Sequence, residues 1–166
     1  MPDVIAPDLD VLFCGINPGL WSAAVGHHFA RPGNRFWKAL QASGFSDGLL
    51  DPADERHLLD LGLGITNLVR RPTAMASDID RDELRAGARL VSRTVTRWQP
   101  RFVAFLGMTA FRAGFDRPRA VLGEQPEALS TARVWLLPNP SGAQARYQLP
   151  DLAAAFAELR AAAAEN

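Results

Sequence analysis

The sequence predicts a three-layer α/β/α fold around a central, mostly parallel, four-stranded sheet. Short apolar runs alternate along the 166 residues with segments of helical periodicity, and 48% of the residues are hydrophobic. Strands that are apolar on both faces are typical of parallel sheets covered by helices on both sides. Neither an internal repeat nor a long linker divides the chain, so we expect residues 1–166 to form a single domain.

Four apolar runs are the candidate strands. They are Val11–Gly15, Gly64–Val69, Phe102–Leu106 and Val134–Leu137. In a parallel sheet of this class, ligands bind in the crevice outside the carboxyl ends of the strands. We therefore expect the loops that follow Gly15, Val69 and Leu137 to lie at one edge of the sheet and to face one cleft.

Five segments are the candidate helices. They are Asn34–Ser43, Pro52–Leu61, Asp80–Gln99, Thr109–Gly114 and Leu152–Ala164. The third is the strongest, because Asp80 and Glu83 have capping-box spacing and Pro100 follows its end. Arginines recur in it every four residues. We interpret them as a solvated outer face, since only the start of that helix belongs near the cleft.

Composition excludes several classes of protein. The single cysteine, Cys14, is too few for a disulfide framework, an iron–sulfur cluster or a thiolate zinc site, and we expect it to be a core residue. We predict no metal and no cofactor. The start lacks a secretion signal, and no apolar run approaches the roughly 20 residues of a membrane helix, so we expect a cytoplasmic protein.

The charge is unevenly distributed along a chain whose formal net charge is zero. Residues 65–120 carry eleven basic and five acidic groups, whereas residues 1–64 carry four and eight. A local positive field of this kind can steer a polyanion such as DNA toward the protein.

The loop Gly15-Ile16-Asn17-Pro18-Gly19 is the first candidate for chemistry. Glycine permits backbone conformations that other residues resist, and proline stiffens a bend. The loop would present backbone N–H groups and the Asn17 side chain to the cleft. By itself, the pentapeptide is equally compatible with an ordinary tight turn.

Three further motifs follow the first in order. They are Pro32-Gly33-Asn34-Arg35-Phe36-Trp37-Lys38, then Gly64-Ile65-Thr66-Asn67-Leu68-Val69-Arg70-Arg71-Pro72-Thr73, and finally Asn139-Pro140-Ser141-Gly142. With the first loop, they resemble the mismatch-specific uracil/thymine DNA glycosylase family of the uracil-DNA glycosylase superfamily. The resemblance covers nearly the whole chain.

The resemblance implies a DNA repair enzyme that acts on double-stranded DNA, associated with the bacterial nucleoid. Such an enzyme flips uracil mispaired with guanine out of the duplex, hydrolyses its N-glycosidic bond and leaves an abasic site; thymine and modified cytosine are the other candidate substrates. Asn17 matches the catalytic asparagine that positions the water. An asparagine carbonyl accepts a hydrogen bond but takes no proton at neutral pH, so we expect a slow enzyme.

The resemblance also implies four base-binding residues. Phe29 matches the aromatic side chain that stacks on the flipped base, and the backbone N–H groups around Ile16 and Phe29 would bind the edge of the pyrimidine. Gly19 belongs to the same loop. Ser22 matches a small residue beside the C5 edge, where bulk would control tolerance for the methyl group of thymine.

The second loop is predicted to bind DNA. In the family it fills the gap left by the flipped base and contacts the unpaired guanine. The predicted DNA-binding residues are Asn139, Pro140, Ser141, Gly142, Ala143, Gln144, Arg146 and, beside the cleft, Arg71. Bacterial members carry a bulky aliphatic residue where this chain has Ala143. Gln144 or Arg146 would therefore have to fill the gap, or the preference for guanine opposite the lesion is weak.

Other residues of the motifs have two interpretations. Asn34 either shapes the pocket or caps the following helix, and both can hold. His27 and His28 lack a nearby third metal ligand, so we interpret them as donors at the pocket rim or toward phosphate. Phe36 and Trp37 are expected in the core.

We expect a monomer. We also expect a monofunctional enzyme, because the motifs contain no lysine placed for a Schiff base; the only lysine, Lys38, lies in a predicted packing helix. Two alternatives stay open. One is a broader uracil glycosylase that also acts on single strands, although that sister branch begins its second motif with histidine rather than Asn139. The other is a weakly catalytic protein that binds mismatches or abasic sites.

Overall fold

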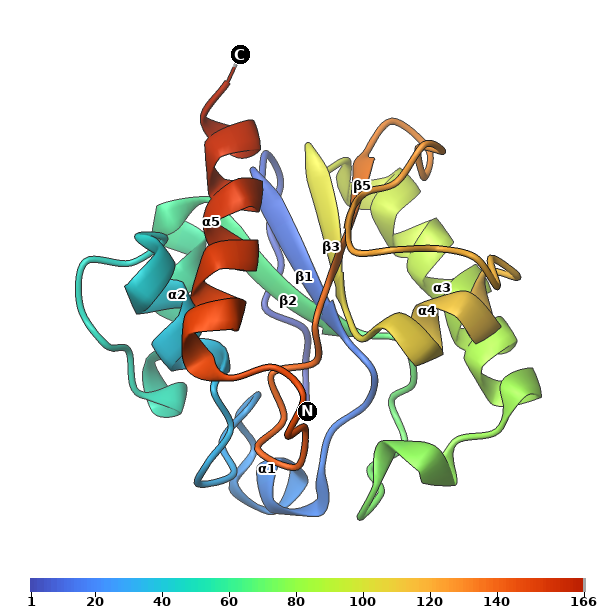
Figure 1. Cartoon of the computed structure of the whole chain (residues 1–166), viewed down its shortest axis with the longest axis horizontal. Coiled ribbons are helices and arrows are strands. Elements are labelled where there is room, and N and C mark those ends of the chain that lie inside the picture. The colour runs from blue at the N-terminus through green and yellow to red at the C-terminus, as the bar shows by residue number, and fades with distance from the viewer. Residues whose placement is uncertain (166) are drawn as a thin grey trace.

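A twisted five-stranded sheet runs through the centre of the protein, which a computed structural model describes from residue 1 to residue 165 (Figure 1). The strands are β1 (Val11–Gly15), β2 (Leu63–Asn67), β3 (Phe102–Leu106), β4 (Gly123–Glu124) and β5 (Arg133–Leu137). Their order is β2-β1-β3-β5-β4. All neighbouring pairs are parallel except β4 with β5. The predicted mostly parallel sheet is confirmed, with β4 as an additional short edge strand.

Helices cover both faces of the sheet (Figure 1). Helices α2 (Phe36–Ser43) and α5 (Leu149–Ala164) pack on one face, and α3 (Arg81–Trp98) and α4 (Met108–Gly114) pack on the other. Alternate residues of each strand enter opposite layers: Phe13 packs with α2 and α5, whereas its neighbour Cys14 packs with α3 and α4. This burial on both sides explains the continuous apolar runs in the sequence.

Helix α3 follows its sequence signals closely. The Asp80 side chain accepts a hydrogen bond from the Glu83 backbone N–H at 2.9 Å, and Gln99 ends the helix in a left-handed conformation. The side chains Leu84, Ala88, Val91 and Val95 are buried, and Arg81, Arg89, Arg93 and Arg97 are exposed. The arginines form the predicted solvated face, in which Arg85 pairs with Asp116 of the neighbouring loop.

Other segments differ from the sequence prediction. Residues Pro52–Leu61 form 3₁₀ turns (η1) rather than an α-helix, because Asp54 has non-helical backbone angles. The short helix α1 (Leu20–Val25) and the 3₁₀ turn η2 (Ala76–Asp78) were not predicted. Helix α1 is only six residues long and exposes most of its apolar residues, so it has no amphipathic period to detect.

The strand order determines where a ligand can bind. The chain leaves β1 toward β2 on one side and leaves β3 toward β5 on the other, so a crevice opens between the carboxyl ends of β1 and β3. Helix α1 and the loop after β5 lie at this end of the sheet (Figure 1). Within residues 1–165, no helix has both the length and the apolar character needed to cross a membrane.

Candidate active site

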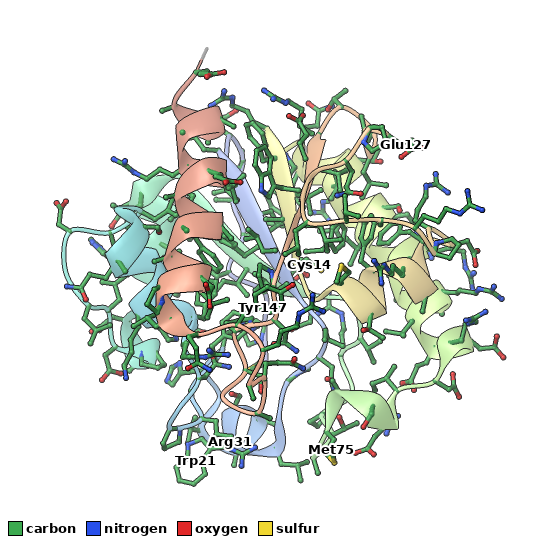
Figure 2. The ribbon with its side chains drawn as sticks, viewed as in Figure 1. Cys14, Trp21, Arg31, Met75, Glu127 and Tyr147 are labelled. Carbon is green, nitrogen blue, oxygen red and sulfur yellow. The ribbon has the colours of Figure 1, made fainter. Side chains whose placement is uncertain are left out.

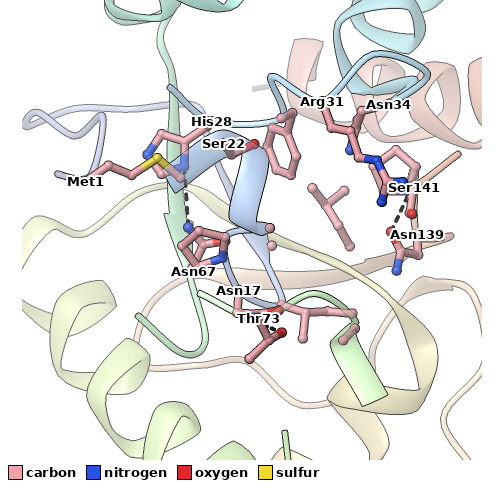
Figure 3. A pocket seen from close by; sticks show the side chains of 18 of the residues that line it. Met1, Asn17, Ser22, His28, Arg31, Asn34, Asn67, Thr73, Asn139 and Ser141 are labelled. Atoms are coloured by element: carbon pink, nitrogen blue, oxygen red, sulfur yellow. Dashed lines mark hydrogen bonds between the residues drawn. The ribbon is translucent and has the colours of Figure 1, made fainter. Parts of the chain in front are cut away.

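A cavity of about 130 Å³ lies at the carboxyl edge of β1 and β3 (Figure 3). The two predicted loops, more than a hundred residues apart in sequence, both contribute to its wall. Eight of the predicted site residues line it: Ile16, Asn17, Gly19, Ser22, Phe29, Asn139, Pro140 and Ser141. The fold therefore brings the first loop, the segment around Phe29 and the base of the second loop around one small space.

The Asn17 side chain is held by its amide nitrogen. Its Nδ2 donates to the carbonyl oxygen of Arg71 at 2.9 Å and to Oγ1 of Thr73 at 2.8 Å. The Thr73 hydroxyl donates its own proton to the Met75 carbonyl at 2.7 Å, so toward Asn17 it acts as the acceptor. Both amide protons of Asn17 are thus engaged. Its carbonyl oxygen Oδ1 is the atom left to accept a hydrogen bond from a ligand or water.

Phe29 has a left-handed backbone, with φ of 52°, which is uncommon for an aromatic residue. Its ring stacks on buried Phe36, with ring centroids 4.2 Å apart. Gly15 leaves room for the outer edge of this ring, because a Cβ there would lie 3.3 Å from its Cε1 and Cζ atoms and 2.6 Å from Oδ1 of Asn67. Such strain at a cavity wall is typical of functional sites.

Two backbone donors face no protein acceptor. Within residues 1–165, the N–H groups of Ile16 and Phe29 are not donated to another backbone or side-chain group, and both residues line the cavity. Both residues are only partly buried, so these N–H groups are accessible to acceptor oxygens of a ligand. Their predicted use in binding the edge of a pyrimidine stays a prediction.

Ser22 is 4% exposed and lies at the cavity wall. Its Oγ accepts a hydrogen bond from the Ala30 backbone N–H at 3.0 Å. The hydroxyl therefore also fixes the turn that carries Phe29. Its predicted place beside the C5 edge of a base stays a prediction.

His28 and Asn67 form a polar pair in the cavity that the sequence analysis did not identify as base-binding. His28 is 1% exposed, and its Nε2 lies 2.9 Å from the Pro2 carbonyl oxygen, to which it can only donate. Its Nδ1 is then an acceptor, 3.4 Å from Nδ2 of Asn67. This contact fixes the Asn67 amide, whose Oδ1 lies over Gly15. The only sequence signal for Asn67 is its place within the motif that spans residues 64–73.

Glu55 contacts the backbone of His28 and the ring of the preceding residue, His27. Its buried carboxylate accepts from the His28 backbone N–H at 3.3 Å and lies 3.4 Å from Nδ1 of His27. The predicted role of the two histidines as donors at the rim is therefore wrong for His28, whose ring is buried and engaged. Residues 1–165 hold no cluster of three or more His, Cys, Asp or Glu side chains suited to a metal ion.

Arg35 ties the second loop to the first half of the chain. Its backbone N–H donates to the Pro140 carbonyl at 3.0 Å, and its guanidinium donates to the carbonyls of Ser141 at 2.7 Å, Gln144 at 3.1 Å and Tyr147. The Arg35 guanidinium therefore holds the second loop in place by binding several of its carbonyl oxygens. In the sequence, Arg35 is part of a motif, but no local pattern predicts this role for it.

The tip of the second loop lies outside the cavity. Gly142 and Ala143 are exposed, and a Cβ on Gly142 would lie 2.7 Å from the Gly33 carbonyl oxygen, so this glycine allows close approach. Gln144 and Arg146 line a neighbouring groove together with Ile16 and Asn139. The contacts of these four tip residues with DNA stay predictions.

The Arg71 side chain turns away from the cavity. Its guanidinium donates to both carboxylate oxygens of Glu83, at 2.9 and 2.8 Å. These hydrogen bonds raise the pKa of Arg71 and lower the pKa of Glu83. Arg71 does not line the cavity but serves it through its carbonyl oxygen, which holds Asn17. Contact between its guanidinium and DNA stays a prediction.

The remaining predicted residues are placed as follows. Asn34 fulfils both interpretations, because its Oδ1 accepts from the Phe36 N–H at 2.9 Å at the start of α2 and the residue also lines the cavity. Phe36 and Trp37 are buried in the core, as predicted. Lys38 is exposed and outside the cavity lining. Burial raises the pKa of the Cys14 thiol, as expected for an inert core residue.

The fold and the cavity define an α/β/α protein whose small ligand site is built by two loops at the switch point of a parallel sheet. The sequence model of the uracil DNA glycosylase superfamily matches residues 2–162, and the chain belongs to this superfamily. It is therefore a DNA glycosylase by family, a hydrolase linked to uracil excision from DNA.

A solved structure supports the fold. A protein from Methanosarcina acetivorans, provisionally named a uracil DNA glycosylase and determined by solution NMR, superimposes with a TM-score of 0.63. The alignment covers 96% of each chain at 20% sequence identity. At that identity the similarity bears on the architecture.

Proposed function

We propose that this protein removes uracil mispaired with guanine from double-stranded DNA, by flipping the base into the cavity and hydrolysing its N-glycosidic bond with a water positioned by Asn17. The observation that carries the proposal is the anchored Asn17 amide. Both of its N–H groups are engaged by Arg71 and Thr73, so only the carbonyl oxygen is available to the cavity.

The proposed chemistry needs an oriented water and a stabilised leaving group. Asn17 Oδ1 accepts a hydrogen bond from the water and directs an oxygen lone pair at the anomeric carbon, without taking a proton. As the bond to the sugar breaks, negative charge develops on the departing pyrimidine, the water oxygen bonds to the anomeric carbon, and the proton that this water loses passes to the solvent or to the released base. The N–H groups of Ile16 and Phe29 donate to its carbonyl oxygens, and fixed donors of this kind stabilise charge that develops in the transition state.

The His28–Asn67 pair supports a preference for uracil and thymine over cytosine. With one N–H directed at His28, Asn67 offers its Oδ1 and its second N–H to the cavity. Uracil and thymine present a ring N–H donor beside a carbonyl acceptor, which complements this amide. Cytosine presents an acceptor nitrogen beside an amino donor, so the same amide would face like groups.

The proposed enzyme is monofunctional and acts as a monomer on chromosomal DNA in the cytoplasm. The lining of the cavity, in the part of the chain that the structure describes, contains no lysine that could form a Schiff base with the sugar. Water is then the nucleophile, and an abasic site is the product.

A panel of DNA substrates under single-turnover conditions tests the proposal. Uracil release is measured from a G·U duplex, an A·U duplex and a uracil-containing single strand, and release of thymine or cytosine is measured from G·T and G·C duplexes. We expect release to be fastest from G·U and absent from G·C. Equal rates on the single strand would favour the broader uracil glycosylase. Tight G·U binding without abasic sites would favour a mismatch-binding protein.

A further inference from the structure

Three large apolar side chains are exposed around the mouth of the cavity. Leu20 is 56% exposed, Trp21 is 53% exposed and Met75 is 64% exposed. Exposed tryptophan is uncommon on a protein surface unless it meets a partner, because its ring is the largest apolar surface a residue offers. We call these three residues the apolar rim.

The apolar rim is continuous with the cavity. A bridge between Gly19 and Thr73, with the Thr73 N–H donating to the Pro18 carbonyl at 3.2 Å, joins the start of α1 to the segment that carries Met75. Gly19, Ser22, Ala74 and Ala76 flank the apolar rim in sequence, and all of them line the cavity. Figure 2 shows Trp21 and Met75 at the same edge of the molecule, directed outward.

The second loop offers little to fill a gap in a base stack. Ala143 is too small for a base-sized space, and Gln144 lines the neighbouring groove rather than the cavity. Arg146 lies with its guanidinium over the Tyr147 ring, 5.4 Å from the centroid, and lines the same groove. We therefore look for a side chain that supports the opened stack elsewhere around the cavity mouth.

We infer that Trp21, with its neighbour Leu20 and with Met75 on the adjoining segment, packs against the nucleobases next to the flipped nucleotide and supports the opened stack that Ala143 cannot fill. The inference rests on the proposed function. Every base has an apolar face on which an aromatic ring can stack, whatever the sequence. Arg31, which is exposed and lines the cavity, places a cation next to this surface for the adjacent phosphates.

Binding to a duplex with a tetrahydrofuran abasic site opposite guanine tests the apolar rim directly, because this probe contains the gap without needing a base to flip. Trp21→Ala should weaken the Kd about tenfold, in the range of aromatic–base stacking. Trp21→Phe should keep most of the affinity. Leu90→Ala is the matched control, since Leu90 is 50% exposed in the middle of α3, outside the cavity lining.

Fluorescence gives a second readout. Of the four tryptophans, Trp37 and Trp135 are buried, and the partly buried Trp98 is the last residue of α3, outside the cavity lining, so stacking on bases should quench mainly Trp21. We expect the abasic duplex to quench the emission of the wild-type protein and to quench that of Trp21→Phe much less. The same titration with an undamaged duplex should give a smaller change.

Two results would overturn the inference: an unchanged Kd for Trp21→Ala, or a variant that loses only self-association in sedimentation while its DNA binding is intact. The second would make the apolar rim an interface between copies of the chain. Failure of the proposed function is distinguishable. If the wild-type protein releases no uracil but binds the abasic duplex through Trp21, the proposed function is refuted, and the inference about the apolar rim is not.

Discussion

Hydrogen bonding at Asn17 decides which atom of its side chain can do chemistry. Because the amide nitrogen is held by the Arg71 carbonyl and by Thr73, the side chain cannot rotate to present N–H groups without breaking two bonds of 2.9 and 2.8 Å. The side chain thus acts as a fixed acceptor. Positioning by a preformed group of this type lowers a reaction barrier without requiring a strong base.

Replacing Asn17 with aspartate tests that geometry. A carboxylate would place an oxygen against the Arg71 carbonyl, where the structure now has a donor, so the side chain should rotate or distort the loop. We expect Asn17→Asp to release uracil more slowly than the wild type, although a carboxylate is the stronger base. Single-turnover rates measure this, with Asn17→Ala for comparison. A faster Asn17→Asp would show that the anchored amide is dispensable.

Phe29 combines stacking with backbone strain. Its ring rests on Phe36 and it is only partly buried, so truncation should cost less than loss of a core phenylalanine. We expect Phe29→Ala to weaken capture of the flipped base by about 1–3 kcal/mol, the usual value of an aromatic–base contact. Thermal unfolding is the control. A collapse of the melting temperature would identify Phe29 as a core residue instead.

Hydrogen bonds from Arg35 hold the second loop in position. Four carbonyl oxygens between residues 140 and 147 accept hydrogen bonds from this one residue. The guanidinium has the fixed, forked geometry to serve several acceptors, which a lysine ammonium lacks.

We therefore expect Arg35→Lys to bind a G·U duplex more weakly and to discriminate less between G·U and A·U, because the loop would no longer be held in one position. Kd values for the two duplexes measure this effect at a single salt concentration. Arg160→Lys is a suitable control, since Arg160 is an exposed arginine at Gly44, on the neighbouring helix α5. Unchanged discrimination in Arg35→Lys would mean that the loop holds its position without the fork.

The helices and strands could be predicted from the sequence where burial gives them a regular pattern of apolar residues. The strands β1 and β3 have the predicted bounds because each is a five-residue run buried on both faces. Helix α3 has both an apolar stripe and a capping aspartate. Strand β4, by contrast, has two residues and exists only through pairing with β5. No local sequence signal exists for an element defined by its partner.

The site residues that belong to a recognisable motif could be predicted from the sequence. Those whose role depends on contacts between distant segments could not. The cavity contains Asn17, Phe29 and the base of the second loop, as the motifs indicated. The orientation of Asn67 depends on His28, whose tautomer depends in turn on the Pro2 carbonyl. Such a chain of contacts between three distant segments cannot be read from spacing along the sequence.

Ion pairs at the surface link the stability of the protein to pH. Glu83 and Glu124 both have lowered pKa values because each accepts hydrogen bonds from an arginine, Arg71 and Arg133 respectively. A lowered pKa in the folded state means that the unfolded chain binds protons more readily. These pairs therefore stabilise the fold above the unfolded pKa of about 4.3, and the contribution is lost as pH falls through the folded values.

We expect the free energy of unfolding to decrease below about pH 4.5 and to decrease less in Glu83→Gln, which has no carboxylate to protonate there. Urea unfolding at a series of pH values between about 3 and 7 measures this. The effect should be small, since both pairs are exposed to solvent. A Glu83→Gln profile parallel to that of the wild type would show that the pair contributes nothing.

The most direct test of the proposed chemistry compares uracil release from a G·U duplex by the wild-type protein and by Asn17→Ala, with enzyme in excess. We predict that the wild type forms abasic sites and that Asn17→Ala is slower by about 100-fold or more, the scale on which a catalytic group acts. The variant should bind the duplex as tightly as the wild type. Near-equal rates would contradict the role of Asn17, and so would a loss of rate explained entirely by a loss of binding.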